Sequence, residues 1–176
     1  MGTIYRLIYG LPFHTIVTLL ALVYIFWCWK ERECSSKTKN RLKLVFGLFF
    51  FCWLATVIFF TIFSRSGVTR IVELKPLQFI EAFFESGKKE LIRSAWMNVV
   101  LFIPGGILLA ELIGEIKPSW KVWVTIIGSV LCISLGIEIL QWYWQLGKSE
   151  VDDVFGNVLG AGIGIYLVQT ARFENK

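Results

Sequence analysis

Charged residues are scarce in this chain of 176 residues, at 18% of the sequence, whereas a soluble domain carries about 25%. Histidine occurs once and the four cysteines form no CxxC pair, so neither a disulfide framework nor a cysteine-bound metal is expected. Hydrophobic residues make up 56% of the chain, and 16% of it is aromatic. A soluble domain of this length has too little interior to bury so much apolar surface. We therefore expect the protein to be surrounded by lipid.

The net charge of +5 does not indicate a nucleic-acid partner, because the 18 basic residues lie in short runs between long apolar stretches. Such runs are typical of loops between membrane spans, and cytoplasmic loops carry the excess of Lys and Arg. Assigning loops 30–43, 114–121 and 171–176 to the cytoplasm places 10 basic residues in 28 positions, against 8 in 49 on the other side. This asymmetry predicts an outer N-terminus and a cytoplasmic C-terminus.

Five apolar runs are candidate transmembrane helices, because about 20 helical residues cross the hydrocarbon core; the fifth is shorter and rich in glycine. They are Leu11–Trp29, Leu44–Phe63, Ala95–Ile113, Val122–Trp144 and Val154–Gln169. In the long outer loop, apolar residues at helical spacing between Pro76 and Gly87 predict a short amphipathic helix. This helix either lies in the membrane interface or packs on the bundle. The expected fold is an all-α integral membrane protein, with two N-terminal helices in residues 1–63 and a second region in residues 64–176.

Polar residues of the last three runs gather near the predicted outer ends of their helices. They are Asn98, Glu138, Gln141, Asp152, Asp153 and Asn157. Glu138 is the strongest functional candidate, because a carboxyl group inside a span costs about 2.5–3.5 kcal/mol unless it is paired or faces water. Ser134, Glu138 and Gln141 share one helical face. For Gln141 the preferred interpretation is a hydrogen bond between helices.

Asp152 and Asp153 stand just before the last apolar run, where a carboxylate caps a helix and complements its dipole. Capping accounts for one aspartate, but it leaves the other and Asn157 unexplained, so this helix end is a candidate site. A network neutralised by basic residues such as Lys148 is the alternative. Oxygen ligands of this kind suit Mg²⁺ or Ca²⁺, although no dedicated spacing assigns a metal.

Small residues and one proline carry further predictions about packing. Gly156, Gly160 and Gly164 recur every fourth residue, which favours close approach of another helix in a membrane. Pro104 lies in the middle of the third apolar run. It removes a backbone hydrogen bond, so a kink or break is expected there.

The last three runs resemble the VanZ-like family of small bacterial membrane proteins, named for the teicoplanin-resistance protein of glycopeptide-resistance clusters. The resemblance rests on the order and spacing of NVVLFIPGG (98–106), IEILQ (137–141) and VDDVFGNVLGAGIG (151–164). It covers about residues 65–164, with Lys148 where an arginine is common in the family. The resemblance implies a multi-pass protein of the bacterial cell membrane that lowers susceptibility to teicoplanin-type antibiotics.

Two functions are compatible with these features. In the first, the protein is not an enzyme and needs no cofactor. A polar pocket in the outer leaflet then binds a membrane lipid headgroup, a lipid-linked envelope precursor or the antibiotic, through Asn98, Glu138, Gln141, Asp152, Asp153 and Asn157. In the second, a membrane-embedded enzyme modifies or hydrolyses a lipid-linked substrate, with Glu138 and Asp153 as catalytic residues and a divalent cation assisting. The lone histidine and the lack of a recognisable nucleophile motif favour the first.

Overall fold

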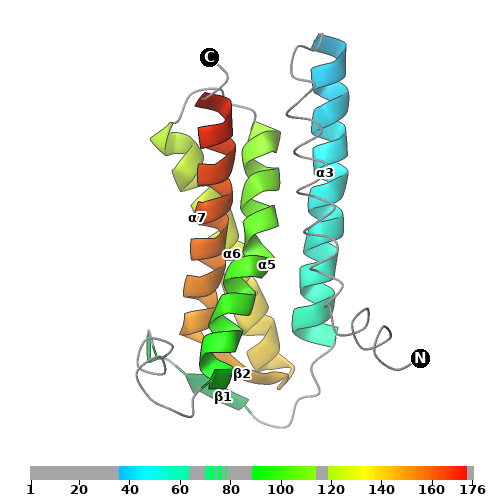
Figure 1. Ribbon diagram of the computed structural model, residues 1–176. Coiled ribbons are helices and arrows are strands. Elements are labelled where there is room, and N and C mark those ends of the chain that lie inside the picture. The colour runs from blue at the N-terminus through cyan, green and yellow to red at the C-terminus, as the bar shows by residue number, and fades with distance from the viewer. Residues whose placement is uncertain are drawn as a thin grey trace, which may run out of the picture.

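The computed structural model describes residues 36–63, 70–73, 75–76, 78, 89–113 and 119–173. In chain order these residues form α3 (Ser36–Ile58), a π-helical turn η1 (Phe59–Phe63), β1 (Arg70–Glu73), α5 (Lys89–Ile113), α6 (Trp120–Tyr143), β2 (Gly147–Glu150) and α7 (Val151–Phe173). The four long helices stand side by side, and the two strands lie together at one end of them (Figure 1). We call this end of the bundle, where α5 and α7 begin and α6 ends, the ribbon end.

Three of the described helices are long and apolar enough to cross a membrane, namely Ser94–Ile113 of α5, all of α6 and Val151–Arg172 of α7. In α3 the apolar part is shorter, Leu42–Ile58. Helices α3 and α6 run toward the ribbon end and α5 and α7 run away from it (Figure 1), as successive membrane spans do. The predicted all-α membrane fold is thus confirmed in its class.

Other predictions fall on residues outside this description. The first predicted span, Leu11–Trp29, lies outside the described residues, so the number of five spans stays a prediction. The same holds for the amphipathic helix between Pro76 and Gly87, most of which is also outside them. The division of the chain at residue 63 likewise remains a prediction.

Two short strands are the main feature that the sequence analysis did not anticipate. β1 pairs with β2 in parallel, with Arg70 opposite Gly147 and Glu73 opposite Glu150. A parallel pair requires a long crossover, which α5 and α6 supply here. We call this pair of strands the ribbon. It connects the segment that follows η1 to the turn between α6 and α7.

The turn after α6 directs the chain into this ribbon. The N–H of Trp144 donates to the carbonyl of Leu140, and that of Leu146 donates to the carbonyl of Gln141, both at 2.9 Å. Between them Gln145 adopts a left-handed backbone conformation, with a φ of 56°, which is uncommon for a residue other than glycine. Gln145 is exposed beyond the helix end, so it does not extend the polar face of α6.

Helices α5 and α7 pack closely because glycines of both lie at their contact. A Cβ atom on Gly160 would overlap the carbonyl oxygen of Val99, and one on Gly164 would overlap that of Ile103. Gly106 of α5 has the same relation to the carbonyl of Ala161. The predicted small-residue packing face of α7 is confirmed, and α5 is the helix that it contacts.

Trp53 of α3 joins that helix to α5. Its indole N–H donates to the carbonyl of Leu101 at 2.9 Å, and its ring meets Phe102 edge to face, with centroids 5.3 Å apart. A Cβ on Gly105 would collide with this indole, so glycine provides the space for it. Helix α5 continues through Pro104 to Ile113, so the helix does not break there, and the kink, which is the other predicted outcome, stays a prediction.

A methyl group at Gly160 is expected to destabilise the protein, because it would meet the backbone of α5. The penalty of overpacking is about 1–3 kcal/mol, which exceeds the gain of about 1 kcal/mol in helix propensity from Gly to Ala. Thermal unfolding of the purified protein in detergent should therefore give a lower Tm for Gly160→Ala. The control is Gly128→Ala on α6, where a Cβ meets nothing within 4 Å and Tm should stay or rise. Equal shifts in both variants would contradict this packing.

Candidate functional site

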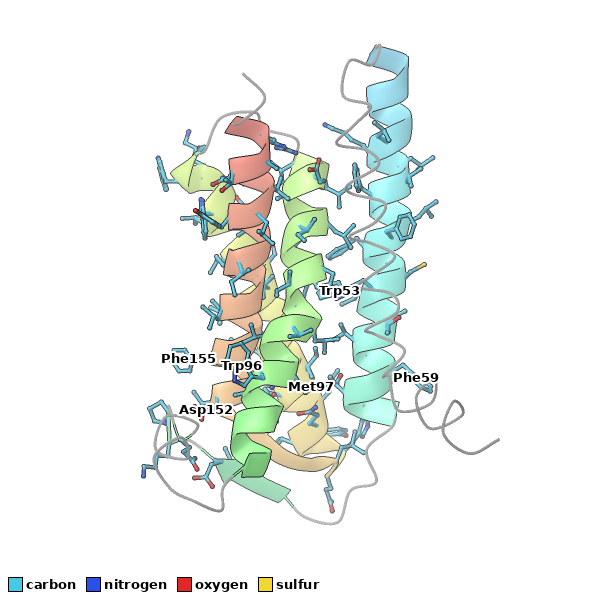
Figure 2. All side chains as sticks on the ribbon, viewed as in Figure 1. Trp53, Phe59, Trp96, Met97, Asp152 and Phe155 are labelled. Carbon is cyan, nitrogen blue, oxygen red and sulfur yellow. The ribbon has the colours of Figure 1, made fainter. Side chains whose placement is uncertain are left out.

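Buried polar side chains of the described bundle gather in its ribbon-end half. They are Ser134, Glu138 and Gln141 on α6 and Asp152, Asp153 and Asn157 on α7. Asn98 on α5 is half-buried. These seven residues are called the polar cluster below, and they include all six predicted ligand-binding residues. Asp152 is labelled in Figure 2 near the beginning of α7.

Asn98 and Asp153 connect α5 to α7. The side-chain amide of Asn98 donates to Oδ1 of Asp153. The contact depends on the glycine face of α7, since a Cβ on Gly156 would lie only 3.0 Å from the Cβ of Asn98. Because α7 begins at Val151, Asp152 and Asp153 both lie in its first turn, where carboxylates favourably meet the positive end of the helix dipole.

The side-chain amides of Asn157 and Gln141 each donate one hydrogen bond to another part of the bundle, while their side-chain oxygens accept none from the described residues. The amide of Asn157 donates to Oγ of Ser134 at 2.8 Å, and the amide of Gln141 donates to the carbonyl of Thr61 in η1 at 3.0 Å. Asn157 is 5% exposed and Gln141 1%. Within the described part of the chain, Oδ1 of Asn157 and Oε1 of Gln141 have no hydrogen-bond partner.

These two oxygens mark the cluster as incompletely satisfied. A buried acceptor without a donor costs about 1–3 kcal/mol, and such groups in folded proteins are normally paired with protein, water or a ligand. Amide oxygens only accept hydrogen bonds. The cluster can therefore receive hydrogen-bond donors from water or from a bound molecule.

Glu138 connects α6 to the ribbon. Its Oε2 accepts the backbone N–H of Glu150 at 3.0 Å, at the junction of β2 and α7. This hydrogen bond offsets part of the cost of burying the carboxyl group. The structure thus gives Glu138 a positioning role for the start of α7, which the sequence alone did not indicate.

An apolar cavity of about 300 Å³ lies beside Glu138, between α6, the ribbon and the start of α7. Apolar side chains make up most of its lining: Val72 of β1, Leu135, Ile139 and Trp142 of α6, and Val151 and Val154 of α7. Glu138 of α6 and Ser149 and Glu150 of β2 complete it. We call it the ribbon groove. The sequence analysis missed these residues, because apolar side chains on apolar helices give no signal until the ribbon is known.

The carboxylates do not form a compact metal-binding group. Among the residues that the structure describes, no three His, Cys, Asp or Glu side chains are placed to hold a metal ion. Glu138 contacts the ribbon, whereas Asp153 contacts α5. The divalent cation and the catalytic pair of the enzyme hypothesis therefore remain predictions without a ligand set in this part of the chain.

At the opposite end of the bundle, polar side chains join α7 to its neighbours in pairs. Arg172 contacts Glu111 of α5 at 2.9 Å, with both side chains nearly buried. The indole N–H of Trp123 on α6 donates to Oε1 of Gln169 at 2.9 Å. These contacts resemble structural links between helices, in contrast to the polar cluster with its two oxygens that lack donors.

Comparison with known proteins agrees with the membrane fold and the motifs. The sequence model of the VanZ/LLP1 family matches residues 46–172, which include most of α3 and nearly all of the chain that follows it. Protein VanZ of Enterococcus faecium is 36% identical over 70 residues, a stretch that covers 40% of this chain and 40% of that relative. No solved structure matches. Because the family match extends over well more than half of the sequence, this membrane protein belongs to the VanZ/LLP1 family.

Proposed function

We propose that this protein lowers the susceptibility of a bacterium to teicoplanin-type glycopeptide antibiotics by binding a lipid headgroup or the drug at its polar cluster. The observation that carries the proposal is the pair of buried oxygens, on Asn157 and Gln141, that lack donors. A fitting ligand supplies hydroxyl, amide or ammonium hydrogens to them. Sugar-bearing and peptide-bearing molecules of the cell envelope, and glycopeptides themselves, are rich in such groups.

The proposal places the ribbon end at the outer face of the cell membrane. The other end of the described helices carries the basic residues Lys37, Lys39, Arg41 and Lys43 at the start of α3, Lys121 at the start of α6 and Arg172 near the end of α7. Excess Lys and Arg favours the cytoplasm. Exposed aromatic residues occur near the ribbon end, among them Phe59, Trp96 and Phe155 (Figure 2). Tryptophan is enriched at membrane interfaces, which agrees with the exposed Trp96 at this end.

In this orientation the polar cluster lies at the depth where lipid headgroups meet acyl chains. A protein that holds a headgroup there, or holds the drug, reduces the access of the drug to the lipid-linked precursors of the cell wall. No turnover is required for this effect. The hydrogen bond from Glu150 to Glu138 is also explained without catalysis, so binding is the function that we propose.

Expression of the wild-type protein in a sensitive bacterium should raise the minimum inhibitory concentration of teicoplanin. Asp153→Leu should remove most of this protection, because it leaves the side-chain amide of Asn98 without its acceptor, which costs about 1–3 kcal/mol, and about 1.4 kcal/mol already corresponds to tenfold in affinity. The control is Gln145→Ala, a change at an exposed residue outside the polar cluster, which should keep the protection. Membrane levels of the variants must be matched by immunoblot. Absence of protection by the wild type would refute the proposed function.

Two substitutions of Glu138 separate binding from carboxylate chemistry. Glutamine keeps an oxygen that accepts the N–H of Glu150, so Glu138→Gln should retain protection within about twofold of the wild type. A twofold change in affinity corresponds to well under the roughly 1.4 kcal/mol that a tenfold change requires. Glu138→Leu leaves that N–H without its acceptor and should lose protection. The measurement is again teicoplanin susceptibility at equal protein level. Complete loss of protection in Glu138→Gln would instead favour the enzyme hypothesis.

A further inference from the structure

The ribbon groove is an apolar hollow on the side of a membrane bundle. Its α6 wall consists of Leu135, Ile139 and Trp142, all within the span Trp120–Tyr143. Ile139 is 63% exposed and Leu135 45%, so the wall continues into the outer surface of the helix. Molecules that surround the bundle can therefore enter the groove sideways.

The chemistry of the lining selects an apolar occupant. Water is poorly held in an apolar cavity, and the surroundings of a membrane span at this depth are lipid chains. The polar residues of the groove are Glu138 of α6 and Ser149 and Glu150 of β2; Glu138 accepts the N–H of Glu150, so all three lie beside the ribbon. The groove is thus apolar along α6 and polar beside the ribbon. An amphiphile fits it when its chain lies along α6 and its polar part is directed toward the ribbon.

We infer that the ribbon groove holds one acyl chain of a membrane phospholipid, entering sideways from the leaflet at the ribbon end. The inference deepens the proposed function, on which it rests for the role of the neighbouring polar cluster. Glu138 belongs to both sites, since it lines the groove and is a member of the cluster. A phospholipid seated with its chain in the groove presents its headgroup beside the cluster.

The test uses the full chain in nanodiscs of phosphatidylethanolamine and phosphatidylglycerol, with a phosphatidylglycerol that carries a diazirine in one acyl chain. After irradiation, mass spectrometry maps the labelled peptides. Labelling should concentrate on residues 135–142 and 151–154. Native mass spectrometry in mild detergent should then show one phospholipid retained after loosely associated lipid has been removed.

Leu135→Trp fills the groove, and Leu131→Trp is its matched control. Leu131 lies one turn earlier on α6 and is 40% exposed, but it is not part of the groove lining. Leu135→Trp should bind the phospholipid about tenfold more weakly than the wild type. This is the loss expected when the indole keeps about two methylene groups of the acyl chain out of the groove. Leu131→Trp should retain it like the wild type. If Leu135→Trp does not fold, Ile139→Trp replaces it.

Equal lipid retention in the two tryptophan variants would overturn the inference, and so would labelling spread evenly over the exposed faces of all helices. A lack of retained lipid in the wild type, as expected if protein instead covers the groove, would overturn it as well. The teicoplanin assay of the wild type tests the proposed function separately. Selective lipid retention without protection refutes only the proposed function, whereas protection without lipid retention refutes only the inference.

Discussion

The close approach of α5 and α7 is the contact on which the rest of the described structure depends. Glycines of both helices let the two backbones come into contact. In a membrane this close van der Waals packing holds helices together, because burying apolar side chains away from lipid provides no hydrophobic driving force. This approach brings Asn98 to Asp153, and it leaves Asn157 directed to Ser134 on α6. The glycines of α5 and α7 thus bring the residues of the polar cluster together, although they have no polar side chains themselves.

The polar cluster connects the helices, and the proposed function adds a second role to the same residues. Its hydrogen bonds connect α6 and α7 to each other and to α5, η1 and the ribbon. A cluster that served packing alone would be expected to satisfy its acceptors, because each lone buried acceptor is destabilising. Asn157 and Gln141 instead keep one oxygen each without a donor. The proposed function assigns these two oxygens to a ligand, and it accounts in this way for their cost in stability.

Periodicity and hydropathy predict the helices well, since α6 begins and ends within two residues of its apolar run. Their ends are predicted less well where charged residues continue a helix beyond the apolar part, as at Lys89 of α5. The sequence also identifies the polar residues, because each is costly in a span. It does not identify their partners. The strand β2, Gly-Lys-Ser-Glu, has no strand pattern. Neither the ribbon nor the groove beside it can therefore be predicted from the sequence alone.

The parallel pairing of β1 with β2 has a consequence for biosynthesis. β1 is made before α5, and its partner is made only after α6, so β1 leaves the ribosome long before it can pair. Helices α5 and α6 must therefore both be inserted before the ribbon closes. The groove, whose lining includes Val72 of β1, is thus completed only after α6 and β2 have been synthesised.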